Sequence, residues 1–197
     1  MLSSTHDDEK SDSCEEECTS SATNNNSNDE YDASITAPNG AVIKVRMRGN
    51  VAVPYGKVDF IFGGAAKFDF ADEEKIRELQ AIKQAQRKEF DSDPQNEELL
   101  NALKDKRHNY ERSISMAQVL IAAGLAESRE QMMLLLLDAG SRAAADGDIV
   151  DSSIEGTNGT VQVSSVWRFI LNGDIALDAV DIRYLTTVIT KPIDTER

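Results

Sequence analysis

Cysteine and histidine are scarce in this 197-residue chain, and their positions exclude several kinds of site. Both cysteines, Cys14 and Cys18, and one of the two histidines, His6, lie within the first 18 residues. No disulfide framework is therefore expected to staple the rest of the chain, which is typical of proteins in a reducing compartment. The second histidine, His108, lies in a charged stretch, so a histidine-based catalytic triad is not predicted.

Metal and phosphate motifs are also missing. Cys14 and Cys18 with His6 offer three soft ligands, whereas a structural zinc site normally needs four at fixed spacing. We interpret the two cysteines as incidental thiols and predict no metal and no cofactor. The sequence has no phosphate-binding Gly-Lys-Ser/Thr loop and no G-x-G-x-x-G after a predicted strand,.

Long hydrophobic runs are absent as well. The longest uninterrupted apolar run covers residues 132–137, far short of the roughly 20 residues that cross a bilayer. The first residues turn acidic, which is the opposite of the basic-then-apolar order of a signal peptide. We therefore expect a soluble, cytoplasmic protein with no membrane partner.

Acidic residues, by contrast, are abundant and unevenly placed. The formal net charge is −14. Ten acidic residues and one basic residue lie between Asp7 and Asp32, among many Ser, Thr and Asn residues. Such a segment cannot bury enough apolar surface to offset its ordering entropy, so residues 1–32 are predicted to be a disordered acidic tail. Residues 33–197 are long enough for one ordinary domain with a core of its own.

The first part of this domain, residues 33–70, is predicted to be β-rich. Residues 33–37 and 41–48 flank Pro38-Asn39-Gly40, and Asn-Gly favours a hairpin turn. In the second arm Ile43, Val45 and Met47 share one face. A further strand pair is predicted over residues 57–62 and 65–70, joined at Gly63-Gly64. Together these segments predict a small antiparallel sheet.

Residues 72–146 have helical periodicity and make helix the majority of the predicted fold. A first helix beginning at Ala71 or Asp72 is followed by Asp93-Pro94, a capping residue and a first-turn proline. The next helix should extend to Ala123, with Gly124 as a left-handed cap. Residues 72–123 thus predict a long helical hairpin.

The last third is less regular. A third helix is predicted to begin at Ser128, in a capping box with Gln131, and to end near residues 138–140 or 146–148. Residues 152–160 are predicted as a loop. Residues 160–190 are predicted to be mixed or helical, with helix over 175–189. The resulting fold class is α+β.

The leading functional hypothesis is a non-enzymatic interaction or assembly component that uses the helical hairpin as its partner surface. The basic and aromatic stretch in the middle of the long helix supplies the candidate contacts Lys106, Arg107, Tyr110 and Ile114. An acidic regulator that competes with nucleic acid for a basic partner is the alternative, and a carboxylate-based enzyme is the second. Direct nucleic-acid binding is not expected, because phosphate affinity depends on Lys and Arg.

Overall fold

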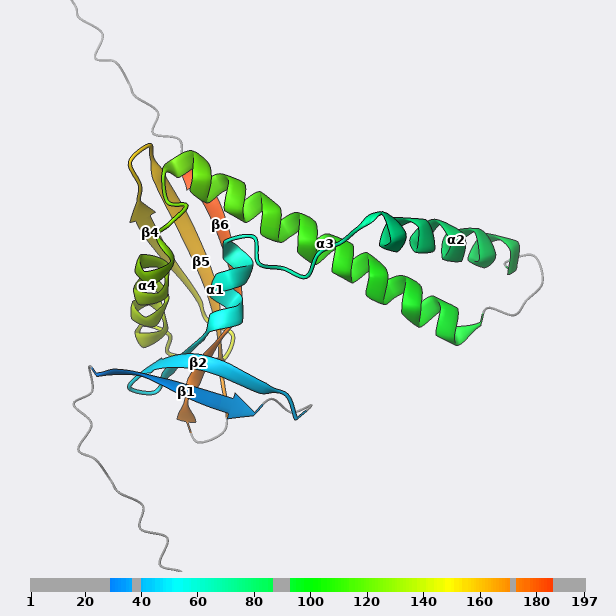
Figure 1. Ribbon diagram of the computed structural model, residues 1–197. Coiled ribbons are helices and arrows are strands. Elements are labelled where there is room, and N and C mark those ends of the chain that lie inside the picture. The colour runs from blue at the N-terminus through cyan, green and yellow to red at the C-terminus, as the bar shows by residue number, and fades with distance from the viewer. Residues whose placement is uncertain (1–28, 37–39, 87–92, 171–172, 186–197) are drawn as a thin grey trace, which may run out of the picture.

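The protein has an α+β fold with a six-stranded sheet. The computed structural model describes residues 29–36, 40–86, 93–170 and 173–185. Within them are β1 (Glu30–Thr36), β2 (Val42–Arg48), β3 (Val51–Pro54), α1 (Tyr55–Ile61), α2 (Phe70–Gln86), α3 (Pro94–Ala123), α4 (Arg129–Ser141), β4 (Ile149–Glu155), β5 (Thr160–Phe169) and β6 (Ile175–Leu185). Figure 1 shows a body of sheet and helices from which α2 and part of α3 project.

The sheet joins the two ends of the described chain. Its strand order is β1-β2-β3-β6-β5-β4. All neighbouring strands are antiparallel except β3 and β6, which pair in parallel at Val51–Ile175 and Ala52–Ala176. The prediction of a small antiparallel sheet confined to residues 33–70 is therefore wrong, because half of the strands come from residues 149–185.

The main core lies between the sheet and three helical segments. Helices α1 and α4 and the C-terminal part of α3 cover one face of the sheet (Figure 1). Trp167 of β5 and Leu136 of α4 are completely buried there. A second, smaller cluster contains Val45, Met47 and Ala52 on the opposite side of the sheet, with Ala176 of β6. The β1–β2 hairpin therefore contributes its buried residues to this second cluster rather than to the main core.

Residues 57–62 form a helix, which corrects the second predicted strand pair. Pro54 has no amide hydrogen to continue a strand ladder, and α1 begins directly after it,. Val58 and Ile61 are both buried, and their spacing of three residues suits one face of a helix. The predicted partner strand over 65–70 is also wrong, since no strand is assigned there and Phe70 begins α2.

Residues 175–185 form a strand, which corrects the predicted C-terminal helix. β6 pairs with β5 from Ile175–Phe169 to Leu185–Thr160. In its second half the buried Val180 and Ile182 alternate with the less buried Asp181 and Arg183, which is the two-residue period of a strand. The predicted loop over 152–160 is also wrong in its first residues, because β4 extends to Glu155. Residues 186–189 lie outside the described residues.

Other boundaries are confirmed. β1 and β2 form the predicted hairpin, although the turn residues 37–39 lie outside the described part. Asp93 caps α3 by accepting a hydrogen bond from the Gln95 amide, and Gly124 ends it with φ of 78°. β1 starts at Glu30, so the last three residues assigned to the acidic tail belong to a strand. The rest of that tail lies outside the described residues, as do Cys14, Cys18 and His6.

The predicted capping box at Ser128 is wrong, although the predicted start of the helix is confirmed. Helix α4 does begin after this residue, but the Ser128 side chain makes no capping hydrogen bond. Its backbone carbonyl instead accepts from the Met132 amide, at 2.9 Å. The helix ends at Ser141, close to the first of the two predicted ends.

None of the described helices is both long enough and apolar enough to cross a membrane.

Candidate interaction site: the projecting helical arm

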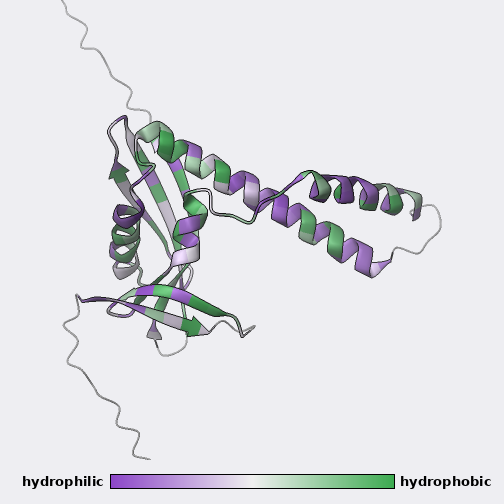
Figure 2. Ribbon diagram, in the orientation of Figure 1, coloured by the Kyte–Doolittle hydropathy of each residue, from purple (hydrophilic) through white to green (hydrophobic). Residues whose placement is uncertain are grey.

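The arm consists of α2 and the N-terminal half of α3, residues 94–109. Figure 1 shows the two helices side by side and extending away from the sheet. Ile76, Leu79 and Leu100 are buried between them, and Phe68 and Leu103 pack around this small cluster. Figure 2 shows hydrophilic residues interspersed with hydrophobic ones along both helices of the arm. The arm therefore has an apolar seam of its own, separate from the main core.

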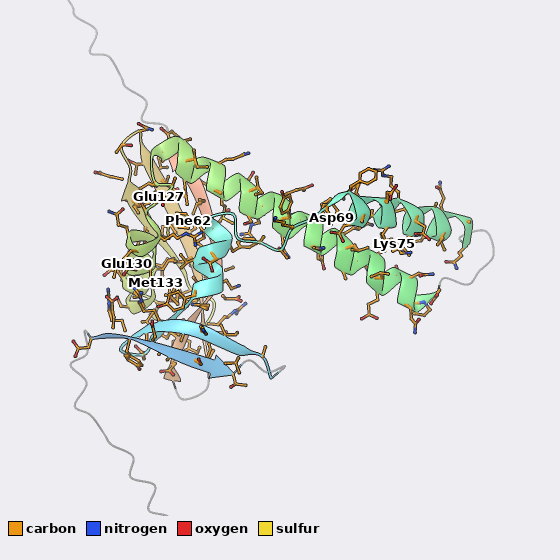
Figure 3. The ribbon with its side chains drawn as sticks, in the orientation of Figure 1. Phe62, Asp69, Lys75, Glu127, Glu130 and Met133 are labelled. Carbon is orange, nitrogen blue, oxygen red and sulfur yellow. The ribbon has the colours of Figure 1, made fainter. Side chains whose placement is uncertain are left out.

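The start of α2 is fixed at the base of the arm by a reciprocal pair of hydrogen bonds. The Asp72 amide donates to the Asp69 carboxylate at 3.1 Å, and the Asp69 amide donates to the Asp72 carboxylate at 3.2 Å. This satisfies two amides that lack partners inside the helix. Figure 3 shows Asp69 at this position and Lys75 farther along α2. The cap explains why α2 begins at Phe70 rather than at Ala71 or Asp72.

Ion pairs connect the two helices along their length. Lys106 Nζ lies 2.6 Å from Asp72 Oδ2, and Arg107 Nη1 lies 3.4 Å from Glu73 Oε2. Nearer the tip, Lys83 pairs with Glu97. The acidic partners in the first two pairs belong to the first turn of α2, where negative charge also suits the helix dipole. These pairs set the alignment of α2 on α3.

All four predicted contact residues lie on α3, but most of them already contact other parts of the chain. Lys106 and Arg107 are the residues that pair with α2. Tyr110 is half-buried. Ile114 is also half-buried, and its Cδ1 lies within 3.9 Å of where a Cβ on Gly63 would sit. These side chains therefore belong mainly to the base of the arm and its junction with the body.

Two exposed apolar side chains of the arm were not among the predicted contacts. Phe70 is 69% exposed and Leu99 is 43% exposed. The Arg77 guanidinium lies 5.9 Å from the centroid of the Phe70 ring, within the range of a cation–π contact. The helical period alone could not separate these residues from the buried seam, because which apolar positions face the other helix depends on how the two helices pack.

The arm is anchored to the body through Ser113. This serine is fully buried, and its hydroxyl donates to the Phe60 carbonyl at 2.6 Å while accepting from the Ala65 amide at 3.3 Å. A buried hydroxyl with both contacts satisfied fixes α3 against α1 and the chain after it. The arm is thus a continuation of a helix that is firmly held in the core.

Beside the base of the arm is an open groove of about 1750 Å³. Its walls come from the β1–β2 hairpin, α1, α3 and β6, and it is lined by four cationic side chains: Lys57, Lys106, Arg112 and Arg168. Two of these are paired with carboxylates, Lys106 with Asp72 and Arg168 with Asp146 and Asp178. The groove is therefore a mixed apolar and cationic surface rather than an enclosed cavity.

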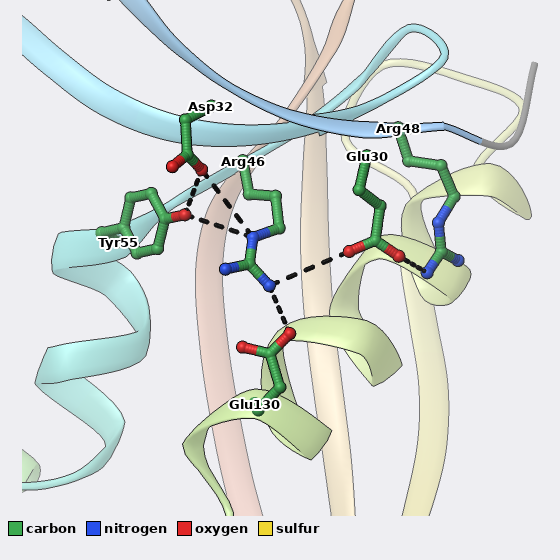
Figure 4. A network of polar contacts seen from close by, with 6 residues as sticks. All are labelled: Glu30, Asp32, Arg46, Arg48, Tyr55 and Glu130. Atoms are coloured by element: carbon green, nitrogen blue, oxygen red, sulfur yellow. Dashed lines mark hydrogen bonds and ion pairs between the residues drawn. The ribbon is translucent and has the colours of Figure 1, made fainter.

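A polar network centred on Arg46 joins the hairpin to two helices (Figure 4). Arg46 Nε donates to the Tyr55 hydroxyl at 3.1 Å, and the guanidinium also pairs with Glu130 of α4. Tyr55 donates to Asp32, and this hydrogen bond, assisted by burial, raises the pKa of Tyr55. Each group has a partner within the network, which is consistent with a structural clamp between β1, β2, α1 and α4.

No group of three or more His, Cys, Asp or Glu residues is placed to hold a metal ion in the part of the chain that the structure describes. Comparison with known proteins gives no family assignment, since no family model and no curated protein match the sequence. The functional argument therefore rests on the residues of this chain.

The pairing of Asp72 with Lys106 should make the arm sensitive to acid. The hydrogen bond from Lys106 lowers the pKa of Asp72, with a smaller contribution from the Asp69 amide. A carboxylate whose pKa is lowered by folding stabilises the fold above its ordinary pKa of about 4, and this contribution is lost as the pH falls through the folded-state value. Asp72→Asn should therefore lower the melting temperature at pH 7, and the difference from the unsubstituted protein should shrink between pH 5 and pH 2. A difference that stays constant over this range would show that the charge on Asp72 is unimportant.

Proposed function

We propose that this chain is a cytoplasmic, non-enzymatic interaction or assembly component that presents the α2–α3 arm to another protein, in the first instance to a second copy of itself. The projection of the arm carries the proposal. The N-terminal half of α3 has α2 as its main neighbour, and both helices extend beyond the core that the sheet organises. A pair of helices that packs on only one side leaves its other sides available to a partner.

The exposed apolar residues of the arm support this use. Phe70 and Leu99 are exposed on helices that also carry many charged residues. Aromatic and aliphatic side chains surrounded by charged ones are the usual composition of an interface centre and its rim. Lys106 and Arg107 then have a supporting role, because they hold α2 in place while the partner contacts the outer surface.

The proposal is tested by placing charge at the two apolar positions. The double variant Phe70→Asp/Leu99→Asp should weaken self-association by about tenfold or more, because each substitution removes a buried apolar contact worth roughly 1.5–3 kcal/mol in the complex. The molar mass would be measured by light scattering behind a sizing column over a range of concentrations. Circular dichroism should show unchanged helix content, since both side chains are exposed in the single chain.

Ile121→Asp is the matched control. Ile121 is 61% exposed and lies on the same helix, but in the half of α3 that packs on the body. It should leave the association unchanged. Equal loss of association in the control and in the double variant would contradict a specific role for the arm, and so would full association of the double variant.

A further inference from the structure

One edge of β6 is free over most of its length within the described residues. β3 pairs with β6 at only two positions, Val51–Ile175 and Ala52–Ala176. The chain then leaves the sheet at Pro54 to form α1. From Leu177 onward, no described strand pairs with this edge of β6. A strand edge that has no partner strand can accept another strand through its backbone amides and carbonyls.

Two cationic side chains donate hydrogen bonds to backbone carbonyls on this edge of β6. Lys57 Nζ donates to the carbonyl of Asp178, and Arg112 Nη2 donates to the carbonyl of Val180 at 2.7 Å. The two carbonyls are two residues apart, the spacing at which a strand directs successive groups to the same side. Neither cation has an ion pair with a described carboxylate. Lys57 and Arg112 thus occupy the position that a neighbouring strand would take, and no described carboxylate neutralises their charge there.

The groove around this edge has two chemically different walls. On the helix side it presents Lys57 of α1 and Arg112 and Asn109 of α3. On the hairpin side it presents Ile35 of β1, Ile43 of β2 and Ala176 of β6. Its volume of about 1750 Å³ exceeds the roughly 300–1,000 Å³ of pockets that hold small molecules. An extended peptide is the class of ligand that fits both the size and the free edge.

We propose that an extended segment of a partner protein, with acidic and apolar residues in alternation, adds to β6 as a further strand. Successive side chains of a strand point to opposite faces of the sheet. Every second residue of the added segment would therefore face Lys57 and Arg112, which selects Asp or Glu, while the others would face Ile35 and Ile43. The peptide amides replace the two cations at the carbonyls of Asp178 and Val180. The cations released from those carbonyls pair with the carboxylates of the peptide.

This surface is separate from the arm contact proposed above, since it requires neither Phe70 nor Leu99. The two proposals therefore stand or fall independently, and the Phe70→Asp/Leu99→Asp variant should bind the peptide normally.

The test uses the full-length protein and a fluorescent ten-residue peptide in which Glu and Val alternate. Two peptides serve as comparisons: one has Lys in place of every Glu, and the other has the same composition arranged as a block of Glu followed by a block of Val. Fluorescence anisotropy should show that the alternating acidic peptide binds about tenfold or more tightly than either comparison. Raising the salt concentration should weaken this binding, because the charge pairs lie at an open groove.

Two substitutions and a control assign the binding to this edge. Lys57→Gln and Arg112→Gln should each weaken binding of the acidic peptide by about three- to tenfold. This is the range expected for loss of one charge-assisted contact. Lys44→Gln, at an exposed position of β2 one residue from Ile43, should have no effect. In hydrogen exchange, the bound peptide should slow the backbone amide of Val180.

Several results would overturn the proposal. Equal binding of the acidic and basic peptides would exclude charge selection by Lys57 and Arg112. Equal binding of the alternating and block peptides, or unchanged exchange at Val180, would exclude strand addition. Binding that appears only when Glu15, Glu16 and Glu17 are replaced by Gln would identify the chain's own N-terminal segment as the occupant, in place of a partner.

Discussion

Trp167→Ala should lower the free energy of unfolding by about 3–5 kcal/mol, the usual cost of emptying a core position of this size. Trp167 is completely buried, in the core cluster that lies under α4. The fit with that helix is close, because a Cβ on Gly140 would lie 2.7 Å from the indole ring. Alanine would leave a cavity that α4 cannot fill without moving as a whole.

The loss of Trp167 also breaks a buried hydrogen-bond chain. Its indole Nε1–H donates to the Ser165 hydroxyl at 2.9 Å, and that hydroxyl donates to the Val150 carbonyl at 3.0 Å. Ser165 is fully buried, so losing one of its partners adds to the cost. Urea titration followed by circular dichroism measures the change. Phe169→Ala, on the same strand at a 43% exposed position, is the control and should cost less than about 1 kcal/mol. Similar losses in the two variants would show that Trp167 is not a centre of packing.

Gly156→Ala should cost about 2 kcal/mol or more, because the new methyl group would meet backbone rather than a mobile side chain. A Cβ at this position would lie 2.0 Å from the carbonyl oxygen of Ala123, at the last residue of α3. That oxygen already accepts a hydrogen bond from the Asn158 amide at 3.0 Å. The substitution therefore pushes the β4–β5 turn away from the end of the helix that carries the arm.

Gly56→Ala provides the comparison for this prediction. Gly56 lies in α1, and a Cβ there would meet nothing within 4 Å. Alanine should be neutral or slightly stabilising at such a helical position. Thermal unfolding of the two variants should separate them clearly. A Gly156→Ala protein that melts at the same temperature as Gly56→Ala would mean that the turn adapts without loss.

The elements that could be predicted from the sequence are those whose signals are local. The hairpin of β1 and β2 and the two ends of α3 depend on neighbouring residues: alternation in 42–48, Asp93 and Pro94 at the start, and Gly124 at the end. Caps and turns act over a few residues, so no knowledge of distant contacts is needed.

The elements that were mispredicted depend on partners far away in the chain. Residues 175–185 contain good helix formers such as Ala and Leu, yet they form a strand because β5 pairs with them along its length. The apolar residues Val58, Phe60 and Phe62 alternate as in a strand, but this segment directly follows Pro54 and packs in the main core, where it forms a helix. Tertiary context overrides such weak local preferences.

The candidate sites also differ in whether they depend on local signals or on distant contacts. The helical arm could be predicted, because both helices have caps and periodicity of their own. The free edge of β6 could not, because it exists only after β3 has paired and left the sheet. Within β6 the alternation of Val180, Ile182 and Tyr184 with charged residues was the one available signal for a strand,.

The parallel pairing of β3 with β6 also determines how the sheet can come apart. Strands β1–β3 and strands β4–β6 each form from short, successive antiparallel connections, whereas only two residue pairs join these two halves. Closing that junction brings together segments separated by α1–α4, β4 and β5, at an entropic cost that grows with the length of the intervening chain. Separation at this junction would leave every antiparallel ladder intact. The sheet is therefore built from two antiparallel halves that are joined by one short parallel pairing, and the groove along β6 begins at that pairing.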